Sequence, residues 1–203
     1  MKNTALKLRL FNALLLCLFS LPLFSQSEQK YKIIFSTRGA AIKPFSLTGH
    51  AFVTFAITDK NEYEIEKQTF GFFPTHNNED ADESAIATVL GEVKEGFNAN
   101  NTGNKATLYV TYWLDEKAWK LAKSSIKPWK KANYSLFKSN CVTFMADIVK
   151  AAGLNSPKTI MKKIIPVYPT AYLKMLMRMN KENPNLESDD VDEDTSIVDT
   201  LSE

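Results

Sequence analysis

Three segments in the first part of the chain have the patterns of β-strands: the first alternates apolar and polar residues, and the second has no clearly polar face, as an inner strand does. They are YKIIFSTRG at 31–39, GHAFVTFAIT at 49–58 and YEIEKQTFGFF at 63–73. Residues 59–62 (DKNE) are suited to a turn, so the second and third strands are predicted to pair as a hairpin. A fourth strand is predicted at 106–114 (ATLYVTYWL), where aromatic and β-branched residues are dense.

Apolar residues recur at helical spacing in the second part of the chain. A helix is predicted from the capping residue Asp115 to the residue before Pro128, and another at 170–179 (TAYLKMLMRM). Between them, KSNCVTFMADIVKAAGL at 138–154 places its apolar residues on one helix face, and Gly153 is suited to end that helix.

The order of the elements predicts the class of the fold. Strands come first and helices follow, which indicates an α+β fold with an antiparallel β-sheet packed against helices. Residues 85–105 are ambiguous, with helical spacing early and a loop rich in Asn and Gly later. The length suits a single domain, which is predicted at 30–180.

Residues 1–25 have the three parts of a secretory signal peptide. A basic start is followed by an apolar run that Pro22 and polar residues interrupt, and the segment ends in the small residue Ser25. The protein is therefore expected to be secreted or periplasmic, with no transmembrane span after cleavage. Cys17 would leave with this segment, so Cys141 would then be the single cysteine and no internal disulfide could form.

The charges are distributed unevenly along the chain. Residues 30–181 contain 22 Lys and Arg and 13 Asp and Glu, a net charge of +9, whereas residues 182–203 contain nine acids and no base. Since the last segment lacks aromatic residues and periodicity, 181–203 is predicted to be a disordered acidic tail. Such a tail either keeps the protein soluble or docks on the basic body or on a partner.

The basic body is suited to an anionic partner, such as cell wall or a phospholipid surface. Six lysines precede the cysteine helix, although such a run is also typical of a solvated helix face: Lys117, Lys120, Lys123, Lys127, Lys130 and Lys131. Nucleic acid is not expected as a partner, because no RNA-binding motif, zinc-finger spacing or phosphate-binding glycine loop is found. No cofactor is expected, and His50, His76 and Cys141 lack the close spacing of zinc ligands.

Cys141 begins its predicted helix and is the main candidate for chemistry. Ser139 or Asn140 is suited to cap the helix, which puts Cys141 in the first turn, where exposed N–H groups and the helix dipole favour an anion. A thiolate there is a nucleophile, and the same N–H groups are suited to hold an oxyanion. The alternative is that Cys141 heads the apolar stripe of the helix as a small core residue.

His50 is the candidate partner of this thiol. It opens the strand 49–58 directly after Gly49, whereas His76 lies in the polar loop PTHNNEDADES and is expected to be solvated. A histidine at the start of an inner strand can meet the head of a packed helix. Such a Cys–His pair combines a nucleophile with its general base. The alternative is a structural histidine that hydrogen-bonds to backbone.

The two motifs together resemble a known superfamily. GHAFV at 49–53 followed by NCVTF at 140–144 is similar to the circularly permuted branch of the NlpC/P60 papain-like superfamily, in which the histidine strand precedes the cysteine helix. The Asn-Cys-x-x-Phe pattern resembles that of the lecithin:retinol acyltransferase-like group, and the likeness covers roughly residues 31–154. It implies Cys141 as nucleophile, His50 as base, and hydrolysis or transfer of an acyl group through a thioester.

A third residue that orients the imidazole is usual in that superfamily. If paired residue numbers across the hairpin add up to 120, His50 lies opposite Phe70 and diagonal to Gln68. A sum of 121 puts His50 opposite Gly71 and diagonal to Thr69, because a slip of one residue exchanges the two faces. Gln68 has the better chemistry and is the candidate third residue.

The sequence therefore predicts a secreted cysteine hydrolase or amidase, with cell-wall peptide as the substrate most natural to that compartment. A lipid-acting thiol hydrolase or acyltransferase is the second hypothesis. The third comes from another class and is a non-catalytic binding module built on the same fold.

Overall fold

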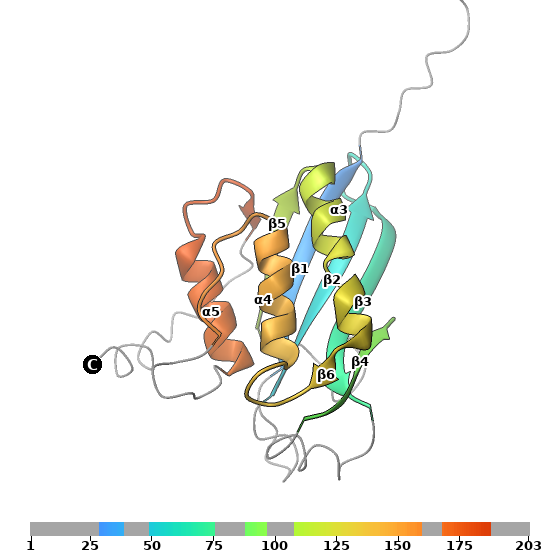
Figure 1. The fold of residues 1–203 in the computed structure, drawn as a ribbon. Coiled ribbons are helices and arrows are strands. Elements are labelled where there is room, and N and C mark those ends of the chain that lie inside the picture. Colours follow the sequence, from blue (N-terminus) through green and yellow to red (C-terminus); the bar gives the residue numbers. More distant parts are fainter. Residues whose placement is uncertain (1–28, 39–48, 76–87, 97–107, 160–167, 188–203) are drawn as a thin grey trace, which may run out of the picture.

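The computed structural model describes residues 29–38, 49–75, 88–96, 108–159 and 168–187. Within these ranges seven strands form one antiparallel sheet, and three α-helices and a 3-10 helix pack against it (Figure 1). The predicted class, α+β with an antiparallel sheet packed against helices, is confirmed.

The strands follow the order β6-β4-β3-β2-β1-β5-β7 across the sheet. Four of them, β1, β2, β3 and β5, match the four strands predicted from the sequence. The bounds are β1 (Lys30–Arg38), β2 (His50–Thr58), β3 (Glu64–Pro74), β4 (Val89–Glu95), β5 (Leu108–Leu114), β6 (Asn133–Tyr134) and β7 (Leu186–Glu187).

The helices all cover the same face of the sheet, as Figure 1 shows. Helix α4 (Cys141–Ala151) lies over β2 and β3, α5 (Pro169–Met179) over β1 and β5, and α3 (Glu116–Ser124) over β1. Alternate residues of the strands beneath them are buried in a common core: Ile33, Phe35, Ala51, Val53, Phe55, Phe70, Phe72, Val110 and Tyr112.

Helix α3 begins where the sequence predicts. The side chain of Asp115 accepts a hydrogen bond from the Ala118 N–H at 2.7 Å, which satisfies one of the free donors of the first turn. The helix ends earlier than expected, at Ser124, and Pro128 lies in the 3-10 helix η1 (Lys127–Lys131) that follows. Proline is tolerated there because the first turn of a helix needs no N–H from it.

Helix α4 has a reciprocal cap that fixes its first residue. The Asn140 side-chain oxygen accepts hydrogen bonds from the N–H groups of Val142 (2.9 Å) and Thr143 (3.0 Å). In return, the Thr143 hydroxyl accepts the Asn140 N–H at 2.8 Å. This arrangement is a capping box, and it selects Asn140 rather than Ser139 as the cap. Cys141 is therefore the first helical residue.

The ambiguous segment 85–105 contains a strand rather than a helix. Val89–Glu95 pairs with β3 as β4, and Val89 and Val93 pack against the core while Leu90 and Glu92 point outward. Gly91 shares their face, where a Cβ atom would lie 2.4 Å from a ring carbon of Phe72. The helical spacing was thus misleading, because a period of two, set by Val89, Gly91 and Val93, determines the packing.

The first residues of the predicted acidic tail are ordered in the structure. Residues 182–187 form a turn and the strand β7, whose Leu186 pairs with Tyr112 of β5 and packs against the core. The Trp113 N–H also donates to the Asn185 carbonyl at 3.0 Å. The predicted signal peptide at 1–25, the loop with His76 and the remaining tail at 188–203 lie outside the described residues. Among the described helices, none is long and apolar enough to cross a membrane.

Removing the cap of α4 should destabilise the protein. Asn140→Ala deletes the acceptor of two helical N–H groups, and we expect a loss of about 1–2 kcal/mol in the free energy of unfolding. Urea unfolding would show this loss as a lower midpoint at an unchanged slope. Asn140→Asp keeps the capping oxygen and should retain most of the stability. Equal midpoints for Asn140→Ala and the natural protein would contradict a stabilising role for the cap.

Candidate active site

Cys141 lies at the start of α4 and is buried, with 5% of its surface exposed. Backbone N–H groups of Ala51, Cys141 and Val142 face its sulfur and lower the pKa of the thiol, as the helix start predicts. Burial acts in the opposite direction and is the larger effect, so the pKa is raised from 9.0 to about 11. At neutral pH the group is therefore a thiol.

His50 is the first residue of β2 and is also buried. Its ring stacks on Phe73 of β3, with ring centroids 4.1 Å apart and an angle of 25° between the planes. Gly71 leaves the room for this stack, since a Cβ atom at residue 71 would lie 2.6 Å from the Phe73 ring and 3.1 Å from His50 Nε2. His50 Nε2 itself is buried and has no hydrogen-bond partner among the described residues.

The charged groups that shift the pKa of His50 are both positive. Arg38 lies opposite His50 on β1, and Lys94 on β4 places its ammonium group 5.3 Å from the centre of the Phe73 ring. Burial contributes most to the shift, followed by Arg38 and Lys94, and together they lower the pKa of His50 to about 3. The imidazole is therefore neutral over the physiological range.

The side chains of Cys141 and His50 lie on different sides of β2. Phe72 packs on Phe144 of α4, with centroids 6.1 Å apart, so the neighbouring Phe73 and the His50 ring stacked on it face away from α4. The Cys141 sulfur instead meets the N–H of Ala51, the residue after His50. The predicted hydrogen bond between the two side chains is therefore not formed in this structure. The sulfur nevertheless contacts the backbone of the residue that directly follows His50.

The predicted contact between His50 and Gln68 is wrong because the register differs. Phe55 pairs with Gln68 and Phe52 with Gly71, so paired numbers add up to 123 rather than 120 or 121. The same sum places Phe73 opposite His50. Gln68 therefore lies further along the sheet and on the face that α4 covers, where its amide donates to the Glu95 carboxylate.

Two local features explain the register. The Asp59 side chain accepts the N–H groups of Asn61 (2.8 Å) and Tyr63 (3.0 Å), which makes the turn longer than the predicted DKNE turn. The pairing also shifts between Ile57 and Thr58, as at a β-bulge. Thr69, the other predicted neighbour of His50, shares a 2.8 Å hydroxyl contact with Thr54 instead.

The chemistry of the site does not include a recognisable metal centre. In the part of the chain that the structure describes, no three His, Cys, Asp or Glu side chains are grouped as metal ligands would be. Sequence reasoning found the two candidate residues, Cys141 and His50, but missed Phe73, Arg38 and Lys94. Phe73 could have been found only if the paired residue numbers of β2 and β3 were known to add up to 123, and no local pattern in the sequence gives that register.

The comparisons with known proteins give little beyond this geometry. No family model and no curated protein matches the chain. Among solved structures, the crystal structure of a type VI secretion system effector, TseH, aligns with 18% identity and a TM-score of 0.46, covering 74% of this chain and 88% of that chain. At that level two chains need not share a fold, so the function of the site must follow from its own residues.

The lowered pKa of His50 should appear in the pH dependence of stability. The unfolded chain binds a proton on His50 near pH 6.5, whereas the folded chain binds it only near pH 3. Stability from this residue is therefore complete above about pH 6.5 and falls as the pH decreases toward 3, by at most about 1.4 kcal/mol per pH unit. The free energy of unfolding, measured with urea between pH 7 and 5, should depend less on pH in His50→Gln than in His76→Gln. An equal pH dependence of the free energy of unfolding in the two variants would contradict the buried, neutral state of His50.

The raised pKa of Cys141 should make the resting thiol slow to react. With a pKa of about 11 instead of 9.0, the thiolate fraction near neutral pH is roughly 100-fold smaller. In a Cys17→Ser chain, iodoacetamide should label folded Cys141 at least about 100-fold more slowly than the same chain unfolded in urea. Rapid labelling of the folded chain at pH 6 would instead indicate a thiolate that already exists at rest.

Proposed function

We propose that this protein is a secreted, papain-like cysteine hydrolase that cleaves an amide bond through a thioester, with Cys141 as nucleophile and His50 as general base. The observation that supports it most is the position of the Cys141 sulfur. It lies in the first turn of a capped helix and against the N–H of Ala51, the residue that follows His50. This position combines a nucleophilic atom, convergent backbone donors and, in the residue before Ala51, a histidine.

The proposal requires the His50 imidazole to turn from Phe73 toward Cys141 when substrate binds. In the stacked position Nε2 has no hydrogen-bond partner in the part of the chain that the structure describes, so leaving this position breaks no hydrogen bond between that nitrogen and a described residue. His50 is the first residue of its strand, directly after Gly49, whose φ of 69° turns the chain at this point. Its side chain therefore lies at the end of the sheet. Moving away from Arg38 and Lys94 also raises the pKa of the imidazole toward the range in which it accepts a proton.

The reaction then follows from the groups present. The imidazole takes the thiol proton as the sulfur attacks the carbonyl carbon. The N–H of Cys141, which the Asn140 side chain does not accept, stabilises the oxyanion that forms. The imidazolium gives its proton to the departing amine, which leaves a thioester on Cys141. Water, deprotonated by the same imidazole, hydrolyses the thioester and restores the thiol.

The substrate proposed first is a peptide of the cell wall. The signal peptide expected at residues 1–25 would deliver the protein to the compartment in which that polymer lies, and an amide is a bond that a thiol and a base can cleave together. A lipid ester would be cleaved by the same steps, so parallel assays of amide and ester substrates separate these two versions of the proposal.

A second candidate function, a non-catalytic binding module, is favoured by a specific observation. No hydrogen bond joins the Cys141 sulfur to the His50 ring in the described structure, and the pKa of each group is shifted away from an active ion pair. Gln68, the candidate third residue, points elsewhere. A protein of this kind would bind the wall peptide or a lipid without turning it over.

Substitution of the two residues separates the functions. With cell-wall peptide fragments as substrate and release of new amino groups as the measurement, Cys141→Ala and His50→Ala should each abolish turnover. The double variant should be no worse than either single one, because the pair acts as a unit. His76→Gln, the matched change at the other histidine, should keep turnover. Unchanged turnover in Cys141→Ala would exclude this mechanism, and equal binding of fragments by all variants without turnover would support the binding module.

A further inference from the structure

The domain contains a groove that neither Cys141 nor His50 lines and that the proposed reaction does not use. It lies between the α3–η1 segment and the strands β3 and β4, and its volume is about 350 Å³. Gln68 and Glu95, which are hydrogen-bonded to each other, lie within it. The residue that sequence reasoning assigned to the active site is thus part of a different concave surface.

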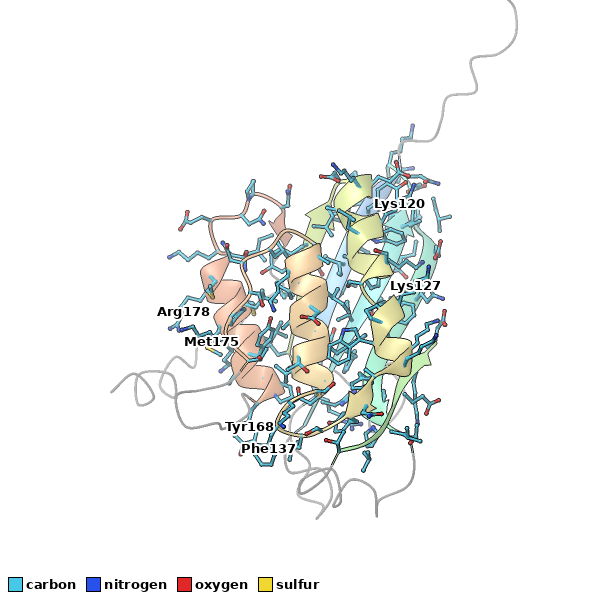
Figure 2. All side chains as sticks on the ribbon, viewed as in Figure 1. Lys120, Lys127, Phe137, Tyr168, Met175 and Arg178 are labelled. Atoms are coloured by element: carbon cyan, nitrogen blue, oxygen red, sulfur yellow. The ribbon has the colours of Figure 1, made fainter. Side chains whose placement is uncertain are left out.

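The walls of this groove are positively charged. Four lysines and one carboxylate line it, a net charge of +3, and the lysines are Lys120, Lys123, Lys127 and Lys130. All four lie on the side of the α3–η1 segment that lines the groove, Lys120 and Lys123 on α3 and Lys127 and Lys130 on η1. Figure 2 shows Lys120 and Lys127 projecting to that same side, toward β3.

The ion pairs already present do not block the groove. Lys123 contacts Glu66 at 2.8 Å, Lys120 contacts Glu116 at 2.6 Å, and Lys130 lies 4.0 Å from Glu95. Pairs of this exposed kind contribute at most about 1 kcal/mol each, so an incoming anion can replace the carboxylates at little cost. Lys127 forms no ion pair with any described residue and is exposed.

The floor of the groove limits what kind of anion it accepts. Its aromatic residues, Trp119 and Phe70, are 5% and 4% exposed and belong to the core. Trp119 is also occupied by other contacts, since its ring stacks edge-on with Phe55 and the Lys123 ammonium lies 4.7 Å above it. No ring in the described part of the groove is therefore open to stack with a nucleic-acid base, which single-stranded nucleic acid requires.

The shape and charge select an extended ligand over a flat one. The lysines stand in a row along a concave surface, which suits a chain with repeated charges better than it suits a planar bilayer. Lysine is a point charge without the fixed fork of arginine, so it selects charge and spacing rather than one anion geometry.

We propose that the groove lined by Lys120, Lys123, Lys127 and Lys130 binds a flexible linear polyanion without bases, with repeated phosphate or sulfate groups along its chain. The site does not depend on the chemistry of Cys141. It would hold such a polymer by releasing its counterions, as lysine-rich surfaces do on other polyanions.

Binding to inorganic polyphosphate tests the proposal. The full chain is titrated with polyphosphate at several salt concentrations, and log affinity should fall linearly with log salt, with a slope of magnitude about 3–4 if all four lysines take part. In the pair Lys127→Gln and Lys130→Gln, affinity at about 0.1 M salt should fall by about tenfold or more, and the slope should decrease by about 2. The matched pair Lys150→Gln and Lys181→Gln removes the same charge from exposed positions outside the groove and should retain the slope.

The remaining outcomes each decide something. A sulfated oligosaccharide bound more tightly than polyphosphate of equal charge would support the groove and identify sulfate as its anion. Equal losses in the two lysine pairs would overturn the proposal, because the effect would then come from net charge alone. A single-stranded oligonucleotide or anionic phospholipid vesicles bound more tightly than both polymers would also overturn it. Cys141→Ala should bind polyphosphate as the natural chain does, whether or not the hydrolase proposal holds.

Discussion

The packing of α4 on β2 and β3 is the constraint on which the rest of the structure depends. Phe144 of α4 contacts Phe72 of β3 and Trp129 of η1, with ring centroids 6.1 and 5.5 Å apart, and Phe72 and Trp129 contact each other at 4.9 Å. Burial of each such ring contributes about 1.5–3 kcal/mol, and favourable ring pairs add about 0.5–1.5 kcal/mol. Because this cluster fixes the rotation and position of α4, the first residue of the helix must lie at the start of β2. The location of Cys141 is thus a consequence of core packing.

The alternation of β2 then decides how the two candidate residues are arranged. Both faces of this strand are buried, so a shift of a single residue would exchange the side chains that face α4 and those that face away. Ala51 faces α4, which leaves its N–H beside the Cys141 sulfur, and His50 turns to the side of Arg38, Phe73 and Lys94. The link between sulfur and histidine runs through the backbone of the strand. This arrangement explains why burial and positive charge, rather than each other, set the protonation of the two groups.

The sequence predicted those features that local signals determine. The patterns of apolar, aromatic and β-branched residues indicated β1, β2, β3 and β5. Polar capping residues indicated the start of α3 at Asp115 and, through Ser139 or Asn140, a start of α4 that places Cys141 in its first turn. The register between β2 and β3 was wrong because it depends on the Asp59 turn and the shift at Ile57, whose geometry no short pattern encodes. Strand β4 was missed because the outward-facing Leu90 interrupts the alternation of apolar and polar residues, and Gly91 adds no apolar side chain to the inward face. The pairing of β7 needs contacts between residues far apart in the sequence.

The two shifted pKa values show how far the resting structure is from an active pair. Moving a proton from a thiol of pKa about 11 to an imidazole of pKa about 3 spans eight pKa units, or about 11 kcal/mol at 1.36 kcal/mol per unit. With the ordinary values of 9.0 and 6.5, the same transfer costs about 3 kcal/mol. Most of the difference comes from burial of both groups, and Arg38 and Lys94 add to it on the histidine side. Turning the imidazole away from Arg38 and Lys94 would remove their share of this difference, while the share from burial would remain. The proposed hydrolysis therefore requires a rearrangement of His50, whereas binding without turnover requires none.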